Sequence, residues 1–117
     1  MAITVVNKHF HKPTKNDIYC GRGSILGNPF TINNKDSLSN VGSRAKAVEY
    51  FKFYLDNKLT AKDKRICNAM NQIYLRAKNG DVNLVCYCAP KACHCDYIKS
   101  LVEEQLPKNR IIQQKLF

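Results

Sequence analysis

Hydrophobic and polar positions follow two spacings along the chain, and the first of them predicts strands. β-branched residues from Ile3 to Val6 are typical of a short strand, and Ile18-Tyr19-Cys20 predicts a second one. The run from Val82 to Tyr87 is apolar on both faces, which favours a strand at the centre of a sheet. Polar segments that contain proline or glycine separate these runs and predict loops.

Three other segments repeat apolar residues every three or four positions, the spacing of an amphipathic helix. We expect helices from about Arg44 to Lys58, from about Thr60 to the stop at Gly80, and from about His94 to Gln105. Their apolar faces are Val48, Phe51, Leu55 and Leu59; Ile66, Ala69, Met70, Ile73, Tyr74 and Ala77; and Ile98, Leu101, Val102 and Leu106.

Capping residues define the expected helix starts. Ser43 is the predicted N-cap of the first helix, and Thr60 with Asp63 fits a capping arrangement for the second. Strands separated by helices predict a small α/β fold with a largely parallel, Rossmann-like sheet and about three helices. We expect a single domain over residues 1–117, in which residues 107–117 form a C-terminal tail or an edge strand.

Composition adds a charge and a compartment to this picture. The longest apolar run is far too short to span a membrane, and no signal peptide is recognisable, so we expect a cytoplasmic protein with reduced cysteines and no membrane partner. A formal net charge of +10 favours an anionic partner such as a nucleotide, a phosphorylated metabolite or nucleic acid. Most of the basic residues are lysine, so a bias of genome composition is the alternative explanation.

Residues that carry chemistry gather between Leu84 and Asp96. This segment contains four of the six cysteines together with His94 and Asp96. It spans the predicted change from a buried strand to a helix, where free backbone N–H groups and a partial positive charge attract anions. We therefore expect a functional site at this junction.

Three kinds of chemistry fit this junction. In a reactive site, the start of the helix would lower the pKa of Cys93, with His94 and Asp96 as acid and base candidates. In an anion site, the first backbone N–H groups of the helix would face a phosphate. In a zinc site, the candidate ligands are Cys86, Cys88, Cys93 and His94. The plain alternative is that the cysteines pack as small hydrophobic side chains.

The loop from Gly21 to Phe30 follows another predicted strand and supports the anion interpretation. Its glycines allow tight turns and close approach to a ligand, and Arg22 can bind a phosphate through two N–H groups. Arg44 lies in the first turn of a helix, where acids are preferred, which favours a role toward a ligand. The candidate ligand-binding residues are Arg22, Gly23, Ser24, Asn28 and Arg44. The alternative is a turn-rich connection with a solvated arginine.

Two motifs carry a resemblance to a known family. The chain reads Y-x-G-R-G-S-x-L-G-N-P-F over residues 19–30 and C-Y-C-A-P-K-x-C-H-x-D over residues 86–96. From about Val5 to Leu101 it resembles the family catalogued as domain of unknown function 4326, whose members look like small bacterial and viral, often phage, proteins. The family typically has tryptophan in place of Tyr87 and glycine in place of Cys95. The resemblance implies a shared site, and it implies no activity.

We therefore expect the protein to bind a nucleotide or a similar phosphorylated ligand between the two loops. If it is an enzyme, we expect a transferase or hydrolase that acts on a glycosidic or phosphate bond, with His94, Asp96 and Cys93 as catalytic residues. No cofactor is favoured, and zinc is the alternative. Two other functions stay open: a zinc-stabilised basic module that binds nucleic acid, and a non-enzymatic structural or partner-binding protein. For a virus-encoded chain the expected location is the host cytoplasm.

Overall fold

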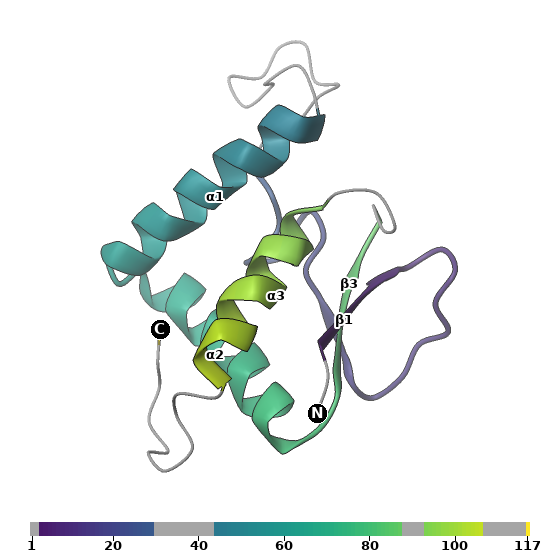
Figure 1. Ribbon diagram of the computed structural model, residues 1–117. Helices are drawn as coiled ribbons and strands as arrows, with labels where there is room; N and C mark the ends of the chain where they lie inside the picture. The colour runs from purple at the N-terminus through teal and green to yellow at the C-terminus, as the bar shows by residue number, and fades with distance from the viewer. Residues whose placement is uncertain (1–2, 30–43, 88–92, 107–116) are drawn as a thin grey trace.

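A parallel sheet forms one layer of the protein (Figure 1). The computed structural model describes residues 3–29, 44–87, 93–106 and 117. In it β1 (Ile3–Asn7), β3 (Val82–Cys86) and β2 (Asp17–Tyr19) lie side by side in that order. Both edge strands pair in parallel with β3, which confirms the parallel sheet and its apolar central strand.

Three helices cover one side of this sheet and complete the predicted α/β fold (Figure 1). They are α1 (Arg44–Thr60), α2 (Lys64–Asn79) and α3 (His94–Gln105). The capping arrangement predicted for α2, with Thr60 as the cap and Asp63 as its partner inside the helix, was wrong. Thr60 is the last residue of α1, and Asp63 caps α2 by accepting a hydrogen bond of 3.1 Å from the Ile66 backbone N–H.

The hydrophobic core lies between the helices and the sheet. Val82, Leu84 and Cys86 alternate along β3, and all three are buried in this core. The predicted apolar faces of the helices supply much of the rest, with the largest side chains at Phe51 and Tyr74. At the far end of the chain, the backbone of Phe117 exchanges two hydrogen bonds with the Asn71 side chain on α2.

The connection between β1 and β2 passes β3 on the side that the helices do not cover, where it contacts Asn83. Asp17 is the centre of its contacts: its carboxylate accepts hydrogen bonds from the Thr14 backbone, the Thr14 hydroxyl and the Asn83 amide, at 2.9–3.1 Å. His11 lies 2.9 Å from the same carboxylate. These hydrogen bonds hold the pKa of Asp17 well below its usual range, with the Thr14 backbone contact as the largest cause.

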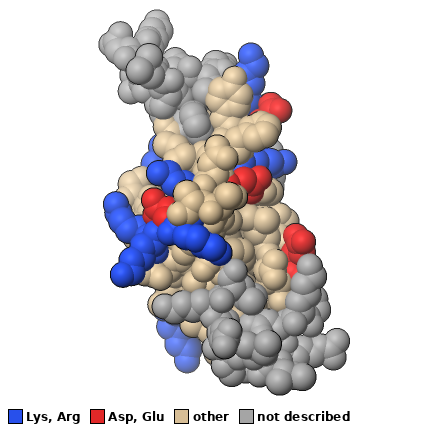
Figure 2. Space-filling view, turned by 90° about the vertical axis from the view of Figure 1, so that its left-hand side faces the viewer, with Lys and Arg blue, Asp and Glu red and all other residues tan. Residues whose placement is uncertain are grey.

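Some predicted features fall outside the described residues. They are the Ser43 cap, Phe30, Cys88 and the edge strand proposed for residues 107–117, apart from Phe117 itself. Within the described ranges no helix is long and apolar enough to cross a membrane. Figure 2 shows lysine and arginine side chains spread over the face that is on the left in Figure 1, with fewer acidic side chains among them.

Candidate functional site

The two candidate loops begin next to each other at the carboxyl edge of the sheet. Cys20 directly follows β2, and its backbone N–H donates to the Val85 carbonyl oxygen on β3. The Cys20 carbonyl oxygen in turn lies 2.5 Å from Nε2 of His94 at the start of α3. The predicted convergence is therefore a direct contact between the end of β2 and the first turn of α3.

His94 makes this contact from inside the protein. Its side chain is buried, and its ring packs edge-on against Phe51 with 5.0 Å between the ring centroids. Burial is the main cause that lowers the pKa of His94, so the imidazole is neutral at neutral pH. With its proton on Nε2, the ring donates to the Cys20 carbonyl and presents Nδ1 to the Cys93 thiol, 3.4 Å away. His94 thus joins β2 to α3.

Cys93 and Asp96 form the cap of α3. The Asp96 carboxylate accepts from the Cys93 backbone N–H at 3.1 Å, and the Cys93 sulfur accepts from the Cys95 N–H at 3.5 Å. The expected lowering of the Cys93 pKa was wrong. A hydrogen bond with the Cys86 thiol, followed by burial, raises the pKa of Cys93 and outweighs the effect of the helix N-terminus.

In the glycine loop, side chains that were expected to bind a ligand form hydrogen bonds within the loop instead. The Ser24 hydroxyl donates to the Gly21 carbonyl oxygen at 2.6 Å. Arg22 donates one Nη1–H to the Asn28 carbonyl oxygen, also at 2.6 Å, and its side chain is otherwise exposed. Gly23 has φ of 90°, in the left-handed region that favours glycine. Arg22 is therefore the predicted ligand-binding side chain that remains best placed to meet a ligand.

Asn28 and Arg44 relate this loop to α1. The Asn28 side chain is buried and donates through Nδ2 to the Ala47 carbonyl oxygen at 3.0 Å, so it fastens the loop to the helix. Arg44 begins α1, and its side chain lies outside the described residues.

A cluster of buried thiols lies behind these contacts. The sulfur atoms of Cys86, Cys93 and Cys95 all lie within 4.8 Å of one another. This group differs from the predicted zinc ligands, because Cys95 joins it, and Cys88 lies outside the described residues. His94 borders the cluster with Nδ1 facing Cys93, while its Nε2 is occupied by the Cys20 carbonyl.

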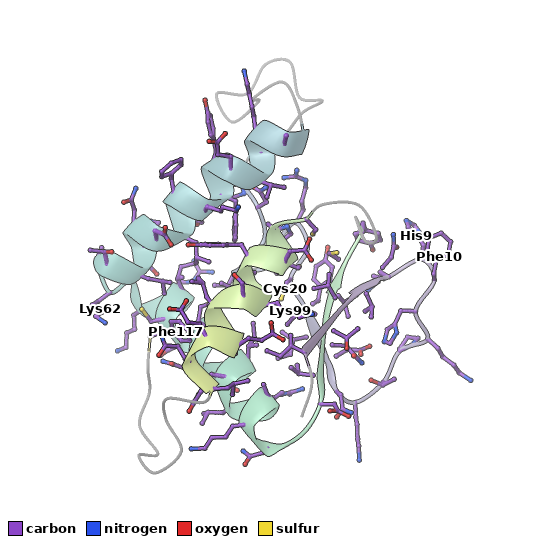
Figure 3. The ribbon with its side chains drawn as sticks, viewed as in Figure 1. His9, Phe10, Cys20, Lys62, Lys99 and Phe117 are labelled. Atoms are coloured by element: carbon purple, nitrogen blue, oxygen red, sulfur yellow. The ribbon has the colours of Figure 1, made fainter. Side chains whose placement is uncertain are left out.

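An aromatic group at the carboxyl edge was missed by the sequence analysis. The Tyr87 ring centroid lies 4.9 Å from that of His9 and 6.2 Å from that of Tyr19. Tyr19 and Tyr87 are 39% and 47% exposed, and Phe10, whose ring contacts that of His9, is 85% exposed. Figure 3 shows His9 and Phe10 on the loop after β1, turned away from the helices, and Cys20 in the interior beside α3. The available signal was that each tyrosine lies at the carboxyl end of a strand.

A pocket of about 370 Å³ lies at the opposite edge of the sheet. Its lining comes from the residues before β2 and β3 and from the end of α2, with Lys15 and Arg76 as its basic side chains. None of the predicted site residues lines it.

The comparisons with known proteins support a family and nothing narrower. No curated protein and no solved structure matches the chain significantly. Residues 5–104 match the family described as Domain of unknown function (DUF4326). This range includes both motifs and all the described elements, except for the first two residues of β1 and the last residue of α3. The chain belongs to this family.

Proposed function

We propose that the protein binds a nucleotide at the carboxyl edge of its sheet, with the base against the exposed tyrosines and the phosphate near Arg22. The observation that carries this proposal is the group of partly exposed rings, His9, Tyr19 and Tyr87, beside two cationic side chains. In open parallel sheets, ligands bind beyond the carboxyl ends of the strands.

The geometry of the rings suits a flat, aromatic ligand. The planes of His9 and Tyr87 are inclined by 59°, and those of Tyr19 and Tyr87 by 79°, so the rings do not stack on one another. Each tyrosine keeps part of its surface open to solvent. Stacking of a base on such a surface contributes about 1–3 kcal/mol and tolerates any base.

Hydrogen bonds between side chains and the backbone position the Tyr19 ring and the Tyr87 backbone. The Asn7 side chain donates to the Tyr87 carbonyl oxygen at 3.2 Å, and the Tyr19 hydroxyl donates to the Arg22 carbonyl oxygen at 3.0 Å. The second bond fixes the Arg22 backbone relative to the Tyr19 ring. A site whose parts are positioned before binding loses less entropy when the ligand arrives.

Positive charge accompanies the rings. The ammonium of Lys8 lies 5.3 Å from the Tyr19 ring centroid, and Arg22 uses one of its five N–H groups on Asn28. Both groups are suited to a phosphate. The proposal is one of binding, and no catalytic step is assigned to His94, Asp96 or Cys93.

Isothermal titration calorimetry with nucleoside monophosphates, the matching nucleosides and inorganic phosphate tests this proposal. We expect Tyr87→Ala to weaken binding of both nucleosides and nucleotides by about tenfold or more. Arg22→Gln should weaken binding of the nucleotides alone, because it removes a phosphate partner. The controls are Phe53→Ala, an exposed ring on α1, and Arg65→Gln, an exposed arginine on α2.

Two results would contradict the proposal. One is wild-type affinity in both Tyr87→Ala and Arg22→Gln. The other is binding only to a single-stranded oligonucleotide, with an affinity that falls steeply with salt, which would favour the nucleic-acid module instead.

A further inference from the structure

Four cysteine side chains from three separate segments meet in the interior of the protein. Cys20 follows β2, Cys86 ends β3, and Cys93 and Cys95 lie at the start of α3. Each is at most 1% exposed. Cys86, Cys93 and Cys95 have their sulfur atoms within 4.8 Å of one another. The Cys20 thiol interacts with that of Cys95 from the edge of this group and donates to the Ile18 carbonyl oxygen at 3.6 Å.

Packing alone is a weak explanation for this arrangement. Cys67 shows what a cysteine that only fills space looks like, because it is buried on α2 and has no place in the cluster. In the cluster, by contrast, three sulfur atoms lie against one another. The Cys20 and Cys86 thiols also donate to backbone carbonyl oxygens at 3.6 and 3.7 Å, but S–H groups are weak donors and weak acceptors. A cation that accepts electron pairs from several sulfur atoms would satisfy them far better.

The spacing of the sulfur atoms fits a single tetrahedral ion. Zinc–sulfur bonds of about 2.3 Å place the sulfur atoms of a tetrahedral site about 3.8 Å apart. The three sulfur atoms, within 4.8 Å of one another, would need to move by only about 1 Å to reach that spacing. The same spacing leaves no room for an iron–sulfur cluster, which places several irons and sulfides between its cysteines.

The local backbone also suits sulfur atoms that carry negative charge. The Cys95 backbone N–H points at the Cys93 sulfur at 3.5 Å, in the first turn of α3, where the helix offers partial positive charge. Complete burial leaves no ligand position open to solvent, which is typical of a structural zinc site and not of a catalytic one.

We propose that Cys86, Cys93 and Cys95, with Cys20 as the fourth ligand, bind one Zn²⁺ that joins the carboxyl ends of β2 and β3 to the start of α3. The site uses other side chains than the proposed nucleotide site, because the four thiols are buried and the neighbouring tyrosines are partly exposed.

Metal binding by the wild-type full-length chain is the first test. Reduced protein is prepared with excess zinc, desalted and examined by native mass spectrometry and by X-ray absorption at the zinc edge. We expect one zinc per chain, surrounded by four sulfurs at about 2.3 Å. A metal-free mass, or a zinc ion held by nitrogen or oxygen ligands, would overturn the proposal.

Serine variants then identify the ligands. Cobalt(II) serves as the probe, since a thiolate-bound tetrahedral cobalt gives charge-transfer and visible absorption bands that zinc abolishes by displacement. We expect four serine variants each to weaken zinc binding by more than about 100-fold: Cys86→Ser, Cys93→Ser, Cys95→Ser and Cys20→Ser. A residue that only orients a ligand costs about 10–100-fold in metal affinity when it is replaced, so a larger loss identifies a ligand.

Cys67→Ser is the matched control, and it should bind like the wild type because it removes a buried cysteine outside the cluster. Unchanged affinity in Cys86→Ser, Cys93→Ser and Cys95→Ser would overturn the site, and unchanged affinity in Cys20→Ser would overturn the four-cysteine set. If a variant fails to fold, the X-ray absorption result on the wild type decides.

Discussion

Gly27 shows how closely the backbone of the glycine loop packs on itself. A Cβ atom at this position would overlap the Gly21 carbonyl oxygen and would press against the Ser24 carbonyl oxygen. Both obstacles are backbone atoms, so no side chain can turn aside to make room. At Gly80, after α2, a Cβ atom would have nothing within 4 Å.

We therefore expect Gly27→Ala to lower the free energy of unfolding by about 1–3 kcal/mol, as overpacking does elsewhere. Urea denaturation followed by circular dichroism measures this change. Gly80→Ala is the control and should be far milder. Equal stability of the two variants would show that the loop can open around Gly27 without cost.

The roles of Arg22, Ser24 and Asn28 show the limit of prediction at this scale. The sequence marks a loop rich in groups that bind anions and bases, and the loop forms where it was expected. The same hydroxyl, amide and guanidinium groups also satisfy the carbonyl oxygens of tight turns. Residue type does not distinguish these uses, and only the folded contacts show that Ser24 and Asn28 face the protein.

At the scale of elements, Asp17 connects β2, β3 and the loop between β1 and β2. Its carboxylate accepts from Thr14 and Asn83, and these contacts hold its pKa well below the ordinary value of 3.8. A depressed carboxyl pKa means that the unfolded chain binds the proton more readily. The contribution of Asp17 to stability is therefore complete above about pH 4 and is lost as pH falls below that value toward the folded pKa.

Thermal unfolding between pH 2.5 and 6 checks this expectation. We expect Asp17→Asn to melt at a lower temperature than the wild type at pH 6, and the difference to shrink below about pH 4. Glu103→Gln, at an exposed position of α3, serves as the control for removing one carboxylate. A difference that stays constant across the whole pH range would contradict the assigned role of the Asp17 charge.

Element boundaries follow from how strongly the sequence marks them. α3 spans His94–Gln105 as predicted, because its start coincides with the capping pair Cys93 and Asp96. The start of α2 was less certain in the sequence, where two capping residues stand three positions apart, and the structure selects Asp63. β2 is only three residues long and begins one residue earlier than predicted, since strands of this length carry almost no periodicity.

At the scale of the whole molecule, Phe51 lies where the helices meet the site. It is fully buried in the core, and its ring contacts that of His94. Two positions further along α1, Phe53 is 62% exposed. Comparing the two phenylalanines therefore shows how much stability comes from burial in the core, because the residue type is the same.

We expect Phe51→Ala to lower the free energy of unfolding by about 3–5 kcal/mol, and Phe53→Ala to change it by less than about 0.5 kcal/mol. Denaturant unfolding monitored by circular dichroism measures both. A mild effect of Phe51→Ala would mean that the core between α1 and α3 is not tightly packed.

The arrangement of the elements was predictable in part. The apolar character of β3 correctly indicated the central strand, and alternating strands and helices indicated the α/β class. The sequence analysis predicted Cys86 and Cys93 of the thiol cluster as ligands, but it missed Cys95 and the distant Cys20. The aromatic edge was missed because Tyr19 and Tyr87 lie far apart in the sequence. The Rossmann-like assignment stays a prediction.

The strand order has a consequence for folding during synthesis on the ribosome. Among the strands that the structure describes, β3 is both the central one and the last in the chain, and it pairs with residues of β1 that lie 79 positions earlier, such as Val85 with Val6. In the described part of the chain β1 and β2 pair only with β3, so the described sheet cannot form until β3 emerges. The nascent chain must therefore keep its first two strands unpaired while α1 and α2 are made, and the sheet assembles in one late step.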